Sequence, residues 1–368
     1  MDNFTIKAAT AVLFMLLCTS CLKEDGLKLP FRSLVPIQLS DGWEISTPES
    51  ENIDGEGLAE IYRNSHDDDQ LWQIRSLVVF RNGKIVAESY MKDPEDRTMP
   101  RAMWSCTKQV VGILAGIAVE KGVIRSTDDA LGDYLPGYTE RYPDKSGITI
   151  DDLLTMRSGI AFENDGFGGG SSKLLRQIPE NSLDYVFGLG MKSAPATAFN
   201  YNDGDPHLIS AVIQSSTGMT LRDWAQQVLV SRLGILNWDW ITYKDGVTMG
   251  GFGILSTPRE MAKICQLIIN DGMWEDTPVV SPVWIREMTS AKVTSGETGL
   301  EKAFGYNWWI DTERGIEFMY GHGGQYFFID RSQKMIVAIT AEPNTQGDFM
   351  LSLKDGLDIY DSIRILVR

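Results

Sequence analysis

Runs of β-forming residues stand at both ends of the sequence, and this distribution constrains the fold more than any other feature. The first two runs, residues 74–80 and 85–90, flank the turn Asn82-Gly83 and predict a hairpin. Four more runs near the C-terminus are separated by short polar turns: 304–311, 316–320, 325–330 and 335–341. We therefore expect an α+β fold, with one antiparallel sheet of N- and C-terminal strands flanked by helices, and an inserted, mostly helical lobe.

Helical patterns lie between and beside these strands. Residues 109–119 predict a long apolar helix, 259–269 a helix that begins after Ser256-Thr257-Pro258, and 351–365 a final helix. Asp205 and Pro206 resemble an N-cap and a first helical residue before 207–214. We expect one domain over residues 71–368, with an α/β lobe formed by about 71–135 and 246–368 and a helical lobe over about 136–245.

The N-terminus is predicted to direct export, with residues 1–20 as a signal peptide. Lys7 precedes the apolar run 8–17, which is well short of the roughly 20 residues that cross a bilayer as a helix. Small residues before Cys21 resemble a lipobox, which predicts lipidation of Cys21, membrane attachment through that anchor and a solvated lead segment over residues 21–70. We expect an outer-membrane or periplasmic lipoprotein, and Leu22-Lys23-Glu24-Asp25 resembles a cell-surface signal. A plain signal peptide without lipidation is the alternative.

Charge and composition exclude several kinds of partner. The net charge of −16 would repel a phosphate backbone, so nucleic acid is not expected as a partner, and the 43% of hydrophobic residues can form a large core. Three histidines without paired cysteines argue against a zinc enzyme, and the carboxylates of Asp67-Asp68-Asp69 beside His66 do not converge on one point. No metal or cofactor is expected. The sequence does not indicate an oligomeric state.

Only two cysteines, Cys106 and Cys265, remain once Cys18 and Cys21 are assigned to export. Two are too few for a disulfide framework, and each lies in an apolar stretch where a buried free thiol is the commoner state. A single bridge between them is the alternative. The core is therefore expected to supply the stability.

Ser105 and Lys108 form the motif Ser-x-x-Lys at the start of the predicted helix. Three residues along a helix place both side chains on one face, where the amine can approach the serine oxygen. A helix start also brings backbone N–H groups to a developing oxyanion. For the lysine to act as a base, its pKa must fall well below the usual value of about 10.4. Ser89 and Lys92 match the same motif, but they end a predicted strand and would point to opposite faces.

Ser105-x-x-Lys108 is followed in order by Tyr201-Asn202-Asp203 and His322-Gly323-Gly324. In this order and at these spacings they resemble the three motifs of the serine β-lactamase, penicillin-binding protein and esterase superfamily. The match is to its class C-like branch, and especially to its esterases and to members like 6-aminohexanoate-dimer hydrolase. The segments 148–159 and 250–257 also resemble that branch. Lys145-Ser146-Gly147 imitates the third motif, but it precedes Tyr201 and predicts a turn.

The resemblance implies a serine hydrolase that forms a covalent acyl-enzyme with a small-molecule or peptide-like acyl substrate. Ser105 would be the nucleophile, with proton transfer shared between Lys108 and Tyr201. The third motif would place Gly324 and the backbone N–H of Gln325 at the oxyanion hole, with the Gln325 side chain free to contact substrate.

Two departures from the family pattern bear on substrate. His322 replaces a lysine, which removes the fixed positive charge that suits the carboxylate of a penicillin. Asp203 replaces an asparagine, so an amide that can donate becomes an acceptor, and its role stays open. Four aromatic residues fit either the pocket or the core equally well: Trp104, Trp308, Trp309 and Tyr326. β-Lactamase, D-peptidase and esterase activities all remain open, and the alternative is an inactive surface lipoprotein that binds peptide or glycan with the same fold.

Overall fold

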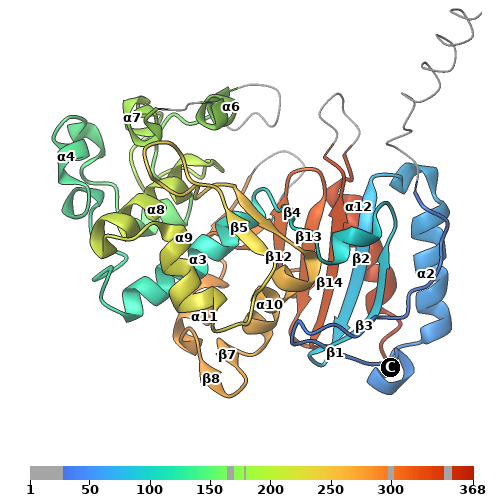
Figure 1. The fold of residues 1–368 in the computed structure, drawn as a ribbon. Helices are drawn as coiled ribbons and strands as arrows, with labels where there is room; N and C mark the ends of the chain where they lie inside the picture. The colour runs from blue at the N-terminus through green and yellow to red at the C-terminus, as the bar shows by residue number, and fades with distance from the viewer. Residues whose placement is uncertain (1–27, 164–169, 178–179, 297–301, 344–349) are drawn as a thin grey trace, which may run out of the picture.

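The computed structural model describes residues 28–163, 170–177, 180–296, 302–343 and 350–368. The expected signal peptide and Cys21 lie outside these residues. Within them, one large sheet carries helices on both faces, and a helical lobe extends from one side of it (Figure 1). The expected α+β fold, with strands from both ends of the chain in one sheet, is confirmed. No helix in the described ranges is both long enough and apolar enough to cross a membrane.

The large sheet joins early strands to late ones. β2 (Ile74–Arg81) pairs antiparallel with β3 (Lys84–Tyr90) on one side and β14 (Met335–Ala341) on the other. The predicted hairpin is therefore formed, and Asn82 and Gly83 both take the positive φ that its turn requires. The sheet order is β1 (Glu44–Ile45), β3, β2, β14, β13 (Gln325–Asp330), β12 (Ile316–Gly321), β11 (Trp309–Asp311), β10 (Ala303–Phe304) and β9 (Val293–Thr294).

One predicted strand is wrong, because residues 304–311 form two strands rather than one. The chain turns between β10 and β11, where Asn307 has a φ of 60° and the N–H of Gly305 donates to the Trp308 carbonyl at 2.9 Å. The turn reverses the chain, so β10 and β11 pair with each other. Their apolar composition did not reveal this turn.

The two faces of the sheet bury separate cores. On one face lie α2 (Gly55–Asp67) and α12 (Leu353–Arg364), and on the other lie α3 (Cys106–Glu120), α10 (Pro258–Ile269) and α11 (Pro282–Met288) (Figure 1). Helix α2 corrects the expectation of a solvated lead segment up to residue 70. Its Leu58 and Tyr62 are fully buried against the sheet, so this part of the lead belongs to the domain. The sequence signal was weak because α2 buries only a narrow apolar stripe.

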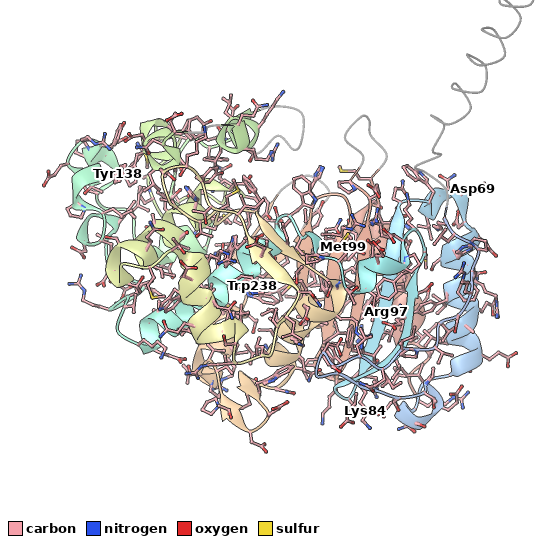
Figure 2. All side chains as sticks on the ribbon, in the orientation of Figure 1. Asp69, Lys84, Arg97, Met99, Tyr138 and Trp238 are labelled. Carbon is pink, nitrogen blue, oxygen red and sulfur yellow. The ribbon has the colours of Figure 1, made fainter. Side chains whose placement is uncertain are left out.

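The helical lobe is built from short helices around one long one. Tyr138, at its outer edge in Figure 2, stacks on Phe187 with ring centroids 4.9 Å apart. Its helices are α4 (Pro136–Thr139), α5 (Ile150–Leu154), α6 (Gly170–Gln177), α7 (Ser182–Gly188), α8 (Gly204–Thr217) and α9 (Leu221–Ala225).

The predicted start of α8 is wrong. The helix begins at Gly204 with Asp203 as its N-cap, so Pro206 is the third helical residue. The carboxylate of Asp205 is buried and accepts a hydrogen bond from the Ser158 hydroxyl at 2.6 Å instead of capping the helix.

A small three-stranded sheet connects the lobe to the main sheet. Its order is β4 (Arg101–Ala102), β6 (Ile254–Ser256) and β5 (Trp238–Trp240). β4 leads directly into the segment that carries Ser105. A separate two-stranded hairpin, β7 (Met273–Trp274) and β8 (Thr277–Pro278), follows α10.

Candidate active site

Ser105 lies at the point where β4 gives way to α3. The preceding residue, Trp104, has a left-handed φ of 49°, and the N–H of Met103 donates to the Ile254 carbonyl at 2.9 Å. Ser105 is the N-cap of α3, but its side chain makes no capping hydrogen bond, which leaves the hydroxyl for other partners. The first backbone hydrogen bond of this turn is donated by the N–H of the next residue, Cys106, to the Met103 carbonyl. A residue with a strained, left-handed backbone thus directly precedes the start of the helix.

Lys108 lies one helical turn on and is completely buried. Its Nζ donates to three acceptors: the Ser105 hydroxyl at 2.9 Å, the Asp203 carboxylate at 2.5 Å and the Gly251 carbonyl at 2.7 Å. An ammonium group has three N–H donors and no acceptor. The charged form of Lys108 therefore has a partner for each of its protons.

The expected fall in the pKa of Lys108 does not occur. Burial disfavours the charged amine, but the negative charge of Asp203, followed by the influence of Tyr201, outweighs burial and raises the pKa. Asp203, whose role the sequence left open, is thus the counter-ion of this lysine. Its side chain is 5% exposed and that of Lys108 is 0% exposed, so water screens the pair very little.

Tyr201 lies beside both groups. Lys108 Nζ stands 4.9 Å from the centroid of the Tyr201 ring. Burial raises the pKa of the phenol, while the charge of Lys108 and a side-chain hydrogen bond with Ser105 act in the opposite direction. Among the described residues the phenol oxygen has no partner at strict hydrogen-bond geometry. The phenol therefore lies next to Lys108 and close enough to Ser105 to influence it.

A pair of glycines brings a distant loop to this cluster. A Cβ on Gly251 would stand 2.6 Å from Cβ of Asp203, and one on Gly250 would stand 2.1 Å from the Pro206 carbonyl oxygen. Only residues without side chains let this loop pack so closely on the start of α8. The approach carries the Gly251 carbonyl to Lys108. The sequence had marked this segment only as family-like, without a role.

The third motif follows β12 and leads into β13. Gly323 and Gly324 both have positive φ, and a Cβ on Gly324 would meet Leu351 at 2.7 Å. The His322 ring contacts the Trp104 ring edge-on, with centroids 5.2 Å apart. Burial first, and then the charge of Arg176, lower the pKa of His322. The imidazole is therefore neutral at neutral pH and supplies no fixed positive charge.

The expectation that the Gln325 side chain is free to contact substrate is wrong. Its Nε2 donates to the Ala341 carbonyl at 2.7 Å and to the His322 carbonyl at 3.3 Å. Gln325 is buried, and its amide joins the motif to β14. A buried amide is costly unless it is hydrogen-bonded, and these backbone groups are its nearest partners.

The undecided side chains divide between site and core. Trp104 contacts His322, whereas Trp308, Trp309 and Tyr326 are fully buried in the core. Cys106 and Cys265 are both free, buried thiols in the described part of the chain.

Both decoy motifs lie elsewhere. Lys92 packs over the Trp72 ring with its Nζ 4.5 Å from the centroid, and Lys145 pairs with Asp144 at 2.8 Å.

Arg176 is a residue that the sequence did not single out. It lies on α6, and its guanidinium carbon is 5.8 Å from the centroid of the Phe252 ring, in the segment that follows Gly251. Its charge also acts on His322. A positive group thus remains near the site although the third motif has lost its lysine. No motif surrounds Arg176, so only the packing of α6 could reveal it.

The fold and the arrangement of Ser105, Lys108 and Tyr201 define a class. The fold is that of the serine β-lactamase and penicillin-binding protein superfamily, which the motifs had suggested. The chain belongs to the Beta-lactamase family, whose model matches residues 70–350.

Individual relatives have low sequence identity to this chain but match most of its length. The chain is 21% identical over 309 residues to 6-aminohexanoate-dimer hydrolase of Paenarthrobacter ureafaciens, covering 77% of this chain and 76% of that protein. The structure of a penicillin-binding protein from Bacillus halodurans superposes with a TM-score of 0.64 at 17% identity, covering 84% of this chain and 98% of that one. A family VIII carboxylesterase gives a TM-score of 0.64 at 15% identity, covering 88% and 98%. At these identities the structural likeness shows the fold alone.

Proposed function

We propose that this protein is a serine hydrolase that cleaves an ester or amide bond through a covalent acyl-enzyme. The observation that carries the proposal is the 2.9 Å contact between Lys108 Nζ and the Ser105 hydroxyl, with the Tyr201 phenol beside both. A serine hydroxyl is a weak nucleophile alone and needs a positioned group to take its proton.

The hydrogen bonds of Lys108 suggest which group takes that proton. Because the ammonium donates all three of its protons, the Ser105 oxygen is an acceptor toward Lys108. The hydroxyl proton of Ser105 is then left to point at the Tyr201 oxygen. We infer that Tyr201 relays the proton and that Lys108 acts as a fixed cation, which stabilises negative charge on both oxygens.

The reaction then has two balanced steps. In acylation, Ser105 Oγ bonds to the substrate carbonyl carbon. The neutral Tyr201 phenol gives its own proton to the leaving oxygen or nitrogen as it takes the Ser105 proton, and the bond between carbon and the leaving group breaks. Water attacks the acyl-enzyme by the same route in reverse. The backbone N–H groups of Ser105 and Gln325 are our candidates for the oxyanion hole, with Gly324 shaping the turn that positions the second one.

The neutral His322 points to the substrate class. It offers no fixed charge to a carboxylate next to the reacting carbonyl, as a penicillin has. The named activities of the relatives, a 6-aminohexanoate-dimer hydrolase and a carboxylesterase, are in keeping with an amide or ester substrate. We therefore expect cleavage of short-chain p-nitrophenyl esters, and little or no hydrolysis of nitrocefin. Rapid nitrocefin hydrolysis would reverse this order.

Labelling at Ser105 tests the nucleophile. One fluorophosphonate molecule should attach to each molecule of the native protein, as intact-mass analysis would show, and none should attach to Ser105→Ala. Ester cleavage by Ser105→Ala should fall about a thousandfold or more. Ser89→Ala is the matched control, because Ser89 belongs to the unused Ser-x-x-Lys match and should label like the native protein. Folded native protein that does not label, or equal ester cleavage by Ser105→Ala, would instead favour a non-catalytic binding protein.

We also propose that the mature protein is an exported lipoprotein attached to a membrane through Cys21, with the cell surface as its destination. The support is the sequence before and after that cysteine. Mass spectrometry of the N-terminal peptide should find a lipid on Cys21, and Cys21→Ser should release the protein from the membrane fraction. An unmodified Cys21, or a mature N-terminus at another residue, would refute the anchor.

A further inference from the structure

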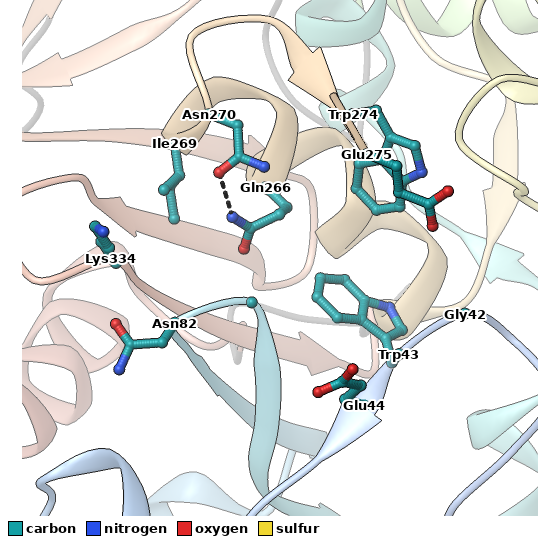
Figure 3. A pocket seen from close by; sticks show the side chains of 11 residues that line it. Gly42, Trp43, Glu44, Asn82, Gln266, Ile269, Asn270, Trp274, Glu275 and Lys334 are labelled. Atoms are coloured by element: carbon teal, nitrogen blue, oxygen red, sulfur yellow. Dashed lines mark hydrogen bonds between the residues drawn. The ribbon is translucent and has the colours of Figure 1, made fainter. Parts of the chain in front are cut away.

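A cavity of about 610 Å³ opens at the end of the large sheet that carries the β2–β3 and β13–β14 turns (Figure 3). β13 begins at Gln325 beside the candidate active site and ends at Asp330, and the cavity-lining Lys334 lies in the turn that follows. At 3.3 to 3.4 Å per residue, this strand separates the two places by roughly 20 Å. Five segments meet at the cavity: the start of β1, the β2–β3 turn, the end of α10, the β7–β8 hairpin and the β13–β14 turn. It is therefore distinct from the site described above.

Two indole rings form one wall of the cavity. The rings of Trp43 and Trp274 lie nearly perpendicular, at 87°, with centroids 6.4 Å apart. Trp43 is held in place, because its N–H donates to the Arg259 carbonyl at 2.9 Å and its ring packs 4.6 Å from that of Phe80. Trp274 is partly exposed, on a hairpin. The two rings therefore form an apolar corner, in which Trp43 is buried and fixed and Trp274 presents the accessible ring face.

Apart from Ile269, the remaining side chains that line the cavity are polar, and they carry little net charge. Gln266 Nε2 donates to Asn270 Oδ1 at 2.9 Å, which leaves the Gln266 carbonyl and the Asn270 NH₂ for another partner. Lys334 and Asn82 line the cavity from the two strand turns (Figure 3), and the Asn82 NH₂ is already donated to Glu51 at 2.9 Å. Two carboxylates complete the lining: Glu44 and Glu275. A fitting ligand must both donate and accept hydrogen bonds at several points. It cannot be strongly anionic, since the carboxylates outnumber the ammonium.

We propose that this cavity binds a neutral saccharide of one or two rings. A pyranose has an apolar C–H face that can stack on an indole, and hydroxyl groups around its edge that both donate and accept. The volume lies within the roughly 300 to 1,000 Å³ range of small-molecule sites. The site would hold the protein on a glycan while Ser105 acts elsewhere, which raises the local concentration of substrates attached to that glycan.

The test is direct binding of neutral disaccharides to Ser105→Ala protein, in which the candidate active site is disabled. Cellobiose, maltose and N,N′-diacetylchitobiose should be compared with an anionic uronic-acid disaccharide, by saturation-transfer NMR and tryptophan fluorescence. At least one neutral sugar should bind and change the fluorescence. Trp274→Ala should weaken that binding about tenfold or more, and Trp274→Phe should weaken it less, because it keeps an aromatic face.

Trp238→Ala is the matched control, because Trp238 is another partly buried tryptophan, on β5 and away from the cavity (Figure 2). It should bind the sugar like its parent, and all three tryptophan variants made in the native background should keep native ester cleavage. Three results would overturn the proposal: no binding of the neutral sugars at about 10 mM, tighter binding of the anionic sugar, or equal losses in Trp238→Ala and Trp274→Ala. None of these depends on whether Ser105 is catalytic.

Discussion

The carboxylate of Asp203 determines the charge of the lysine in the candidate site. Without it, burial alone would favour a neutral amine, as in the usual argument for a lysine base. With it, Lys108 stays a cation that donates to Ser105, so in the proposed mechanism the Ser105 proton leaves by another route. One residue that differs from the family pattern thus changes the role of a residue that matches it.

Asp203→Asn tests this assignment. Wild-type Lys108 has a raised pKa, so its charged form should persist to high pH, and ester cleavage should fall off only at strongly alkaline pH. In Asp203→Asn, the largest influence that opposes burial is lost, so the pKa of Lys108 should drop. The alkaline fall in kcat/KM should then move to lower pH, by one unit or more as an order of magnitude. The pH dependence of kcat/KM measures this shift.

The opposite outcome has a definite meaning. If neutral Lys108 is the base, Asp203→Asn should raise kcat/KM at neutral pH, because a larger fraction of the amine would be unprotonated. Fluorophosphonate labelling and thermal unfolding of the variant would show whether its fold and nucleophile are intact. Tyr201→Phe should lose activity in either case, so it cannot replace this test.

At the scale of elements, the site depends on how one loop packs against the start of α8. Asp203 is the N-cap of that helix. Gly250 and Gly251 have no side chains, so the backbone of the loop packs directly against the start of the helix. The same loop gives Lys108 its third hydrogen-bond acceptor. The position of the lysine amine is thus set by three elements: α3, α8 and the loop before β6.

Gly251→Ala should disrupt this packing. Its Cβ would stand 2.6 to 2.7 Å from backbone and Cβ atoms of Asp203, which cannot move away as a flexible side chain can. We expect kcat to fall at least about tenfold, with a loss of stability of about 1 to 3 kcal/mol. Steady-state kinetics and urea unfolding measure the two effects.

Gly190→Ala is the matched control for that substitution. A Cβ there meets no atom within 4 Å, and its φ is not positive, so activity and stability should both stay near native values. Native activity in Gly251→Ala would show that the loop can shift without moving Lys108.

At the scale of the whole molecule, both faces of the sheet must be covered before the site can form. The face toward the helical lobe carries α3 and hence Ser105, while the other face is closed by α2 and α12. Helix α2 comes from the segment before the first long strand, and its Tyr62 hydroxyl donates to the Leu77 carbonyl of β2 at 3.1 Å. The N-terminal segment thus belongs to the folded unit.

Tyr62→Ala should therefore destabilise the protein by about 3 to 5 kcal/mol, the usual cost of emptying a buried aromatic site. Tyr62→Phe keeps the ring and should cost only about 1 kcal/mol, for the lost hydrogen bond. Arg63→Ala, an exposed neighbour on the same helix, is the control and should change little. Urea unfolding gives all three values. A Tyr62→Ala protein as stable as the control would mean that α2 is dispensable.

The sequence by itself determined the features that depend on near neighbours. The Asn82-Gly83 turn fixes the first hairpin, and β-rich runs between short polar turns fix β12, β13 and β14. The three-residue spacing of Ser105 and Lys108 puts both on one face of α3. It missed the turn at Asn307 and the true start of α8, because tertiary contacts decide where those elements break.

Only the tertiary structure decided the charge and partners of the site. Lys108 donates hydrogen bonds to Asp203, which is 95 residues away in the sequence, and to Gly251, which is 143 residues away. The side chain of Gln325 donates to the carbonyl of Ala341, on another strand. The packing of α6 likewise brings the charge of Arg176 close enough to lower the pKa of His322. A pKa depends on burial and on charges within a few ångströms, and those neighbours come from segments that no local pattern relates to one another.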